Sequence, residues 1–171
     1  HAGEFPREHA QVQALPGIGR STASAILALA HDEPHAILDG NVKRVLSRCF
    51  AIHGYSGIKS VAAQLWQLAE VNTPLLRAAD YTQAIMDLGA TLCTRSKPRC
   101  TECPLRNQCL ACAQGLQNQL PTPKPKRQRP QRTALALVVV DAQGRVLLER
   151  RPPAGVWGGL WVCPQFADEP S

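Results

Sequence analysis

The sequence predicts a mainly helical domain followed by a smaller domain rich in strands. Three observations lead to this expectation. Up to residue 92, apolar residues recur at helical spacing, as in Val42, Val45 and Leu46. The segment 120–132 then holds four prolines and five basic residues, the composition of a stiff, extended linker. After it, residues 134–140 are all apolar, which is typical of a buried strand.

The helical part should contain five segments before the cysteine-rich stretch, the last of them in one or two pieces. Ser21 or Thr22 suits the N-terminus of the second segment, because hydroxyl side chains cap free amides there. Residues 141–144, with the sequence DAQG, indicate a turn between two strands. The expected helices cover 7–14, 21–31, 41–52, 60–71 and 74–92, and the expected strands cover 134–140 and 145–149.

Charge is unevenly distributed along the 171 residues, whose formal net charge is +6. Residues 1–132 hold 16 Lys and Arg against 9 Asp and Glu, and residues 133–171 hold 3 against 4. A basic domain suits a polyanionic partner such as nucleic acid. No apolar run is long enough to cross a membrane. The N-terminus has neither a signal peptide nor a starting Met, so we expect a fragment of a cytoplasmic protein.

A glycine-containing turn, Leu15-Pro16-Gly17-Ile18-Gly19-Arg20, separates the first two predicted helices. Its glycines can adopt tight-turn conformations, and the amides that begin the second helix lack helical partners. Such amides, with the helix dipole, attract phosphate, so the segment predicts contact with a DNA backbone. An ordinary corner between two helices is the alternative. The candidate DNA-binding residues are Leu15, Gly17, Gly19, Arg20, Ser21 and Thr22.

Asp39 follows the hairpin, between an apolar stretch and the start of a predicted helix. Taken alone it reads as a helix cap. Together with the hairpin, the segment 37–45 (ILDGNVKRV) resembles the helix-hairpin-helix–Gly/Pro–Asp superfamily of DNA glycosylases. That resemblance implies that Asp39 is catalytic. A carboxylate is suited to this chemistry, because cleavage of an N-glycosidic bond develops positive charge on the sugar, after the base has been flipped out of the duplex.

Two branches of the superfamily differ at the position of Ser21. Endonuclease III-like enzymes carry a lysine there, which forms a Schiff base and supports strand cleavage. Ser21 offers no amine, and the segment 38–45 is similar to the MutY-type adenine DNA glycosylases. The resemblance implies that Asn41 helps to orient the catalytic groups and that Ser21 lies near the base pocket.

Four cysteines, Cys93, Cys100, Cys103 and Cys109, have the spacing C-x6-C-x2-C-x5-C. Four thiolates on a short loop suit a [4Fe–4S] cluster or a structural zinc ion. This spacing resembles the cluster loop of endonuclease III and the MutY family, which favours the [4Fe–4S] cluster. We expect the cluster to shape a basic loop that meets phosphates. Cys112 is an additional cysteine nearby, whereas Cys49 and Cys163 are expected to be inert core residues.

The block 150–161, RRPPAGVWGGLW, resembles the opening of the Nudix-like α+β domain of the same family, which recognises 8-oxoguanine. For Trp161 we expect core packing. The resemblance thus divides the chain into a helix-hairpin-helix DNA glycosylase domain that lacks its N-terminal helices (1–92), the four-cysteine loop (93–112), a basic proline-rich linker (113–132) and the truncated start of the Nudix-like domain (133–171).

The function implied by the resemblance is base excision repair. Adenine mispaired with 8-oxoguanine or guanine in double-stranded DNA would be released by monofunctional hydrolysis. The glutamate that protonates adenine cannot be assigned in this chain, so the fragment alone is expected to be weak or inactive. Two alternatives remain: an endonuclease III-like glycosylase/lyase, and a non-catalytic iron–sulfur module that binds DNA. DNA binding would place the protein on the bacterial nucleoid.

Overall fold

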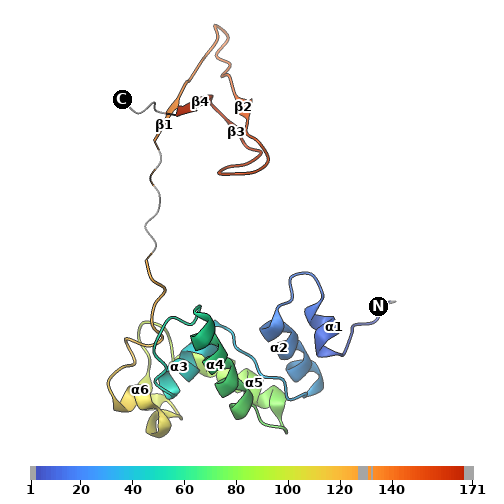
Figure 1. The fold of residues 1–171 in the computed structure, drawn as a ribbon, viewed down its shortest axis with the longest axis vertical. Helices are drawn as coiled ribbons and strands as arrows, with labels where there is room; N and C mark the ends of the chain where they lie inside the picture. The colour runs from blue at the N-terminus through green and yellow to red at the C-terminus, as the bar shows by residue number, and fades with distance from the viewer. Residues whose placement is uncertain (1–2, 127–130, 132, 168–171) are drawn as a thin grey trace. The chain divides into compact units, whose positions relative to one another are not determined.

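The computed structural model describes residues 3–126, 131 and 133–167 (Figure 1). The chain separates into two compact units, His1–Pro125 and Lys126–Ser171. The first is built of helices and the second of short strands, so both parts of the predicted order are present.

The first unit contains all five predicted helical segments, the last in two pieces of which the second is a π-helix. Short 3-10 helices and one further helix follow in the cysteine-rich stretch. In the part of the chain that the structure describes, no helix is both long and apolar enough to cross a membrane. The bounds are α1 His9–Gln13, α2 Arg20–His31, α3 Gly40–Cys49, α4 Lys59–Asn72, α5 Ala78–Asp87, η1 Leu88–Leu92, η2 Cys100–Glu102, η3 Arg106–Gln108 and α6 Leu110–Ala113.

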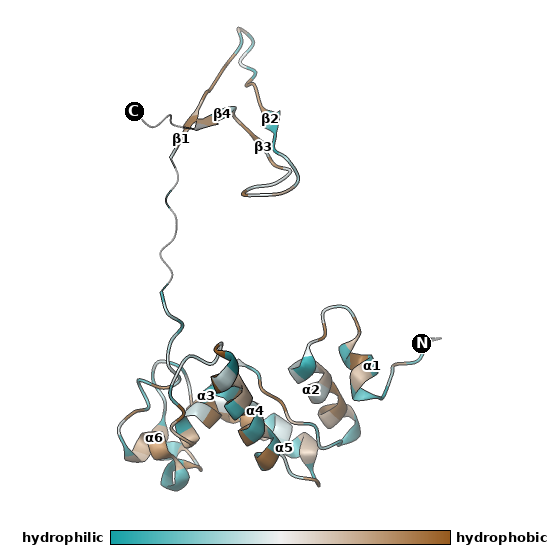
Figure 2. Cartoon of the chain, viewed as in Figure 1, coloured by the Kyte–Doolittle hydropathy of each residue, from teal (hydrophilic) through white to brown (hydrophobic). Residues whose placement is uncertain are grey.

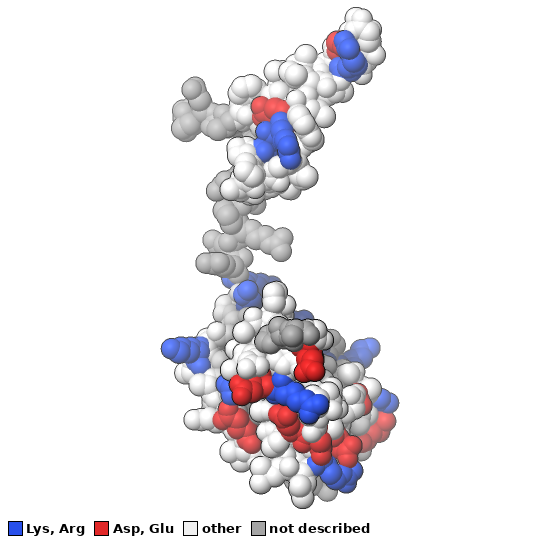
Figure 3. All heavy atoms as spheres, turned by 90° about the vertical axis from the view of Figure 1, so that its right-hand side faces the viewer, with Lys and Arg blue, Asp and Glu red and all other residues white. Residues whose placement is uncertain are grey.

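Helix α3 is central to the first unit, because it packs against α4, α5, α6 and η1. Its apolar face supplies Val42, Val45 and Leu46, which are buried together with Leu65 of α4 and Ile85 of α5. A second, smaller cluster holds α2 against α1. Figure 2 shows apolar and polar residues on the same helices, as expected for helices that each bury one face. Figure 3 shows one side of this unit, where acidic and basic side chains are interspersed.

The boundary between the units, after Pro125, falls within the predicted linker 113–132, and residues 113–125 belong to the helical unit. Leu120 is buried, and its carbonyl accepts a hydrogen bond from the Arg48 side chain. The Gly54 amide donates to the Thr122 hydroxyl at 3.0 Å. The first part of the expected linker is therefore attached to the first unit. The remainder of the expected linker lies mostly outside the described residues.

The second unit pairs its strands in two separate two-stranded sheets. Strand β1 (Ala134–Ala136) is antiparallel to β4 (Gln165–Ala167), and β2 (Glu149–Arg150) is antiparallel to β3 (Trp161–Val162). The predicted turn is present: Val140 and Val146 form an antiparallel bridge, and the Asp141 carboxylate accepts from the backbone amides that follow it.

Two expectations about burial in the second unit are wrong. The apolar run that begins at residue 134 is exposed, with Val138 at 63%, and Trp161 is 64% exposed rather than packed in a core. The physical reason is that two short ladders form no second layer over these side chains within the described residues. Cys163 here and Cys49 in α3 are both half-buried.

Candidate active site and cysteine pocket

The hairpin between α1 and α2 is a tight turn closed by backbone hydrogen bonds. The Leu15 amide donates to Val12 and the Ile18 amide donates to Leu15, at 3.2 and 3.1 Å. Gly17 has a φ of +81°, which L-residues rarely adopt. Gly19 precedes the 12-residue helix α2 as its N-cap and provides no side-chain cap. The amides of the first turn, which includes Arg20, therefore have no side-chain cap.

Gly17 needs to be glycine because of its backbone conformation, but Gly19 does not. Its φ of −90° is accessible to any residue, and a Cβ atom built on it would meet no atom within 4 Å. Neither backbone conformation nor packing inside the chain thus requires glycine there. The missing side chain leaves the N-terminus of α2 open to a close external approach.

The Arg20 side chain is held against α4. Its guanidinium donates to the Glu70 carboxylate at 2.5 Å and lies 3.8 Å from the centroid of the Trp66 ring. Both partners of the ion pair are about half exposed. Arg20 therefore links α2 to α4, and its backbone amide rather than its side chain is the group at the end of the helix.

Ser21 links the hairpin to the segment that carries Asp39. Its hydroxyl accepts a hydrogen bond from the Leu38 amide at 2.9 Å. Ile37 and Leu38 are buried in the core, which anchors the segment that precedes Asp39. The half-buried Asp39 is the N-cap of α3, where Oδ1 accepts from the Val42 amide at 2.8 Å. The hydrogen bonds of the described residues leave Oδ2 unused.

Asn41 and Arg44 connect the first turn of α3 with the π-helix η1. The Arg44 guanidinium donates to Asn41 Oδ1 at 2.8 Å, to the Gly89 carbonyl at 2.5 Å and to the Cys93 carbonyl at 2.6 Å. Gly89 is buried, and a Cβ atom on it would lie 2.7 Å from the Asn41 Cβ. The close approach of η1 to α3 therefore needs glycine at this position.

Arg48, one helical turn beyond Arg44, is buried and spans the cysteine loop. It donates to the carbonyls of Leu120, Thr94 and Arg95 and, at 3.3 Å, to the sulfur of Cys93. Burying a guanidinium is costly unless its donors are paired, and four of the five N–H groups of Arg48 have partners here. The residues beside Asp39 on α3 are thus tied to the loop that carries the cysteines.

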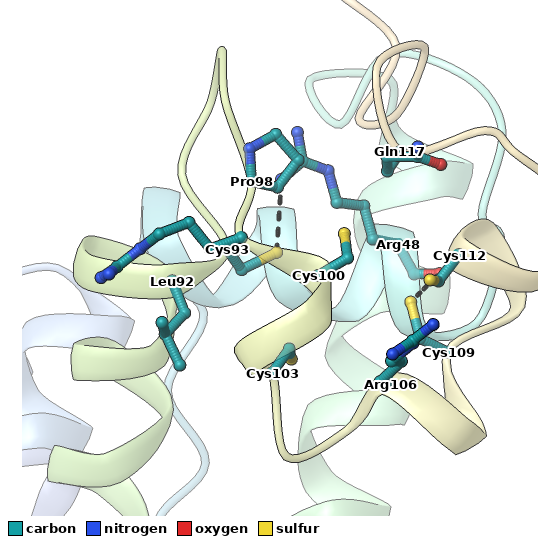
Figure 4. A pocket seen from close by; sticks show the side chains of 11 residues that line it. Arg48, Leu92, Cys93, Pro98, Cys100, Cys103, Arg106, Cys109, Cys112 and Gln117 are labelled. Atoms are coloured by element: carbon teal, nitrogen blue, oxygen red, sulfur yellow. Dashed lines mark hydrogen bonds between the residues drawn. The ribbon is translucent and has the colours of Figure 1, made fainter.

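All four cysteines of the predicted motif line one pocket beside Arg48 (Figure 4). A fifth cysteine, Cys112, lines the same pocket. As placed, no three His, Cys, Asp or Glu side chains among the described residues form a group that could hold a single metal ion. A four-iron cluster binds its thiolates through different irons, so its ligands need not converge on one point. Four cysteine thiolates are the donors that such a cluster uses.

The thiols of this pocket influence one another. Burial raises the pKa of Cys100, and the neighbouring Cys112 thiol raises it further. Burial is also the main cause of the raised pKa of Cys109. Cys49, on the far end of α3, has its pKa raised first by burial and then by Cys109, Cys103 and Cys93. A bound cation reverses this effect, because it favours the thiolate form.

Three residues of the site were not singled out for their roles from the sequence. Arg44 and Arg48 are four residues apart on an amphipathic helix, and this spacing alone does not tell a solvated pair from a buried one. Cys112 was noticed only as an extra cysteine. Arg95 and Arg99 of the cysteine loop are both exposed, and Arg99 forms an ion pair with Glu102 at 3.1 Å.

Curated relatives cover nearly the whole chain. The adenine DNA glycosylase of Buchnera aphidicola subsp. Acyrthosiphon pisum is 34% identical over 99% of this chain, and that of Homo sapiens is 32% identical over 99%. The chain is a homologue of the adenine DNA glycosylases. It spans 48% of the Buchnera glycosylase and 39% of the human one, so it corresponds to about half of these relatives or less. No family model matches the chain.

Solved structures place the helical part of this adenine DNA glycosylase homologue in the helix-hairpin-helix DNA glycosylase fold. A thermostable thymine-DNA glycosylase is 30% identical, with a TM-score of 0.56 over 66% of this chain and 52% of its own. Endonuclease III in a non-covalent complex with DNA is 26% identical, with a TM-score of 0.54 over 67% of this chain and 52% of its own.

Proposed function

We propose that the protein to which this chain belongs hydrolyses the N-glycosidic bond of adenine mispaired with 8-oxoguanine or guanine in duplex DNA. The observation that carries the proposal is the position of Asp39. The Ser21–Leu38 hydrogen bond joins the Asp39 segment directly to the first turn of the hairpin helix. This hydrogen bond supports the proposal that the Asp39 carboxylate acts beside a site for the DNA backbone, in a chain homologous to adenine DNA glycosylases.

The hairpin provides the contact with phosphate. Helix α2 begins with amides that have no side-chain cap, and Gly19 leaves their approach open. Backbone amides at a helix N-terminus bind phosphate oxygens without reading the base sequence. The hairpin would thereby hold the strand while the adenine is out of the stack.

Asp39 would stabilise the sugar cation as the glycosidic bond breaks. One carboxylate oxygen is used in capping α3, which fixes the side chain, and the other is available to the sugar. Arg44 holds Asn41 in place in the same helical turn. Water then completes an abasic site. Ser21 has no amine and its oxygen is occupied by the Leu38 amide, which favours hydrolysis without a Schiff base over the endonuclease III-like alternative.

The cofactor that fits the cysteine pocket is a [4Fe–4S] cluster held by Cys93, Cys100, Cys103 and Cys109. The guanidinium of Arg48 supports this assignment, since a buried positive charge beside Cys93 suits a set of thiolates. The cluster would supply structural support for the loop that carries Arg95 and Lys97, and the loop would contact phosphates.

Single-turnover release of adenine from a duplex with adenine opposite 8-oxoguanine tests the proposal, using the full-length protein and its Asp39→Asn variant. Asparagine caps a helix as well as aspartate does, so folding should be preserved. We expect the rate to fall by about 100-fold or more, because a preorganised charge at the reacting centre is lost. Unaltered protein should leave the strand intact until alkali is added.

Asp80→Asn is the matched control, because Asp80 is an exposed carboxylate that pairs only locally with Arg77. It should release adenine at the unaltered rate. Equal rates for Asp39→Asn and the unaltered protein would refute the role of Asp39. Absence of release from folded unaltered protein would refute the substrate.

A further inference from the structure

The cysteine pocket contains one more thiol than a four-iron cluster needs. Cys112 lines it together with the four cysteines of the spaced motif. It lies on α6, whose N-cap is Cys109. Ala111 between them is fully buried, and α6 packs against α3. Cys112 therefore faces the pocket because of how α6 is anchored.

Cys112 lies on the side of the pocket formed by Cys100 and Cys109. Burial raises the pKa of Cys100 most, and the thiol of Cys112 is the next cause. For Cys109, after burial, the Cys112 amide lowers the pKa and the Cys112 thiol raises it. Figure 4 shows the two sulfur atoms of Cys109 and Cys112 beside each other. The Cys93 sulfur accepts a hydrogen bond from the Arg48 guanidinium.

The ligand position of Cys109 is the one that a neighbour can take over with little rearrangement. Cys109 is the N-cap of α6, a helix of only four residues. Its thiol donates to the Arg48 carbonyl at 3.5 Å, and a thiol is a weak hydrogen-bond donor. Both thiols already line the pocket, so an exchange of ligand between them needs a rearrangement of this single turn only.

We propose that Cys112 is a reserve ligand of the iron–sulfur cluster, able to bind the iron that Cys109 binds when Cys109 is absent or detached. This rests on the cofactor proposed above. The exchange breaks one iron–thiolate bond and forms another. Cys112 releases its proton, and the departing Cys109 thiolate takes up a proton, so the cluster keeps its charge and oxidation state.

Cluster content tests the proposal in the full-length protein, measured as iron and sulfide per chain and as visible absorbance. Cys109→Ser should retain most of the cluster, Cys112→Ser should retain all of it, and the double variant should lose it. Cys93→Ser is the control and should lose the cluster with Cys112 intact. A folded Cys109→Ser protein without a cluster, or a loaded double variant, would overturn the proposal.

Two measurements give the same test by other means. In loaded Cys109→Ser, iodoacetamide followed by mass spectrometry should find Cys112 protected, and full alkylation of Cys112 would contradict the exchange. If Cys109→Ser does not fold, the rate of iron loss to a chelator is measured instead. Cys112→Ser should lose iron several-fold faster than unaltered protein, and equal rates would overturn the proposal.

Unaltered protein that binds no cluster would refute the cofactor itself, whereas failure of the variants alone refutes only the exchange.

Discussion

At the scale of the residue, Asp39 shows that a capping role and a catalytic role can belong to one side chain. The sequence left the two alternatives open, and the structure demonstrates the cap through Oδ1 and the Val42 amide. A carboxylate has two oxygens, so the cap occupies one and orients the other. The hydrogen bond from the Val42 amide holds the side chain in the orientation of the cap. The cap is therefore compatible with the proposed catalytic role and supports it by fixing the geometry.

The two hairpin glycines are predicted to respond differently to alanine. Gly17→Ala should lower the free energy of unfolding by about 1 kcal/mol, because an L-residue is strained at a φ of +81°. Gly19→Ala should lower it by only about 0.5 kcal/mol, the cost of alanine at an N-cap, since a Cβ meets no neighbouring atom there. Gly19→Ala should instead weaken binding to duplex DNA by obstructing the phosphate.

Urea unfolding and a duplex binding titration at one salt concentration check this contrast. Ala14→Gly, at the exposed end of α1, serves as a control for the hairpin and should leave DNA binding unchanged. A Gly19→Ala protein that binds duplex DNA as tightly as the unaltered protein would contradict the assignment of the amides to phosphate.

At the scale of the element, α3 joins the two candidate sites. Asp39 caps its first turn, Arg44 follows on the side that faces η1, and Arg48 reaches the cysteine loop from the last turn. The opposite face supplies Val42, Val45 and Leu46 to the core. A helix packed on one face and hydrogen-bonded on the other has little freedom to rotate. A change in the structure of the cysteine loop should therefore shift the turn of α3 that carries Asp39.

Gly89→Ala is predicted to separate η1 from α3. The new Cβ would lie 2.7 Å from the Asn41 Cβ and 3.1 Å from its backbone carbon, which cannot yield as a flexible side chain would. Overpacking of this kind costs about 1–3 kcal/mol. Urea unfolding should show this loss, and the Arg44 hydrogen bonds to Asn41 and Gly89 should weaken with it.

Ala90→Ser is the control, because Ala90 is the next residue of η1 and is exposed. It should unfold at nearly the unaltered urea concentration. Equal stability of Gly89→Ala and Ala90→Ser would show that η1 does not need the close approach.

At the scale of the whole molecule, the distribution of basic charge matches the proposed function. The first 132 residues carry the excess of Lys and Arg. Within the first unit several of these side chains already bind other groups of the protein, such as Arg20, Arg44 and Arg48. The charge available to DNA is thus smaller than the composition suggests, and it includes the exposed cysteine loop.

Arg95→Glu should reduce the salt dependence of duplex binding. Each phosphate contact contributes about −0.9 to the slope of log K against log salt, so a loss of about one contact is expected. A salt titration on duplex DNA measures the slope. Arg145→Glu is the control, because Arg145 is exposed and pairs with Asp141 in the second unit. Unchanged slopes for Arg95→Glu would exclude the loop from the phosphate contacts.

The sequence by itself determined the helical order, the hairpin, the turn at residues 141–144 and the cysteine spacing, because each depends on neighbours within a few residues. Only the tertiary structure decided that Arg48 is buried, that Arg20 is held by α4, and that Cys112 enters the pocket. It also corrected the burial of Trp161 and attached the first part of the predicted linker to the helical unit. These properties depend on which distant segments pack together, and local spacing carries no information about that packing.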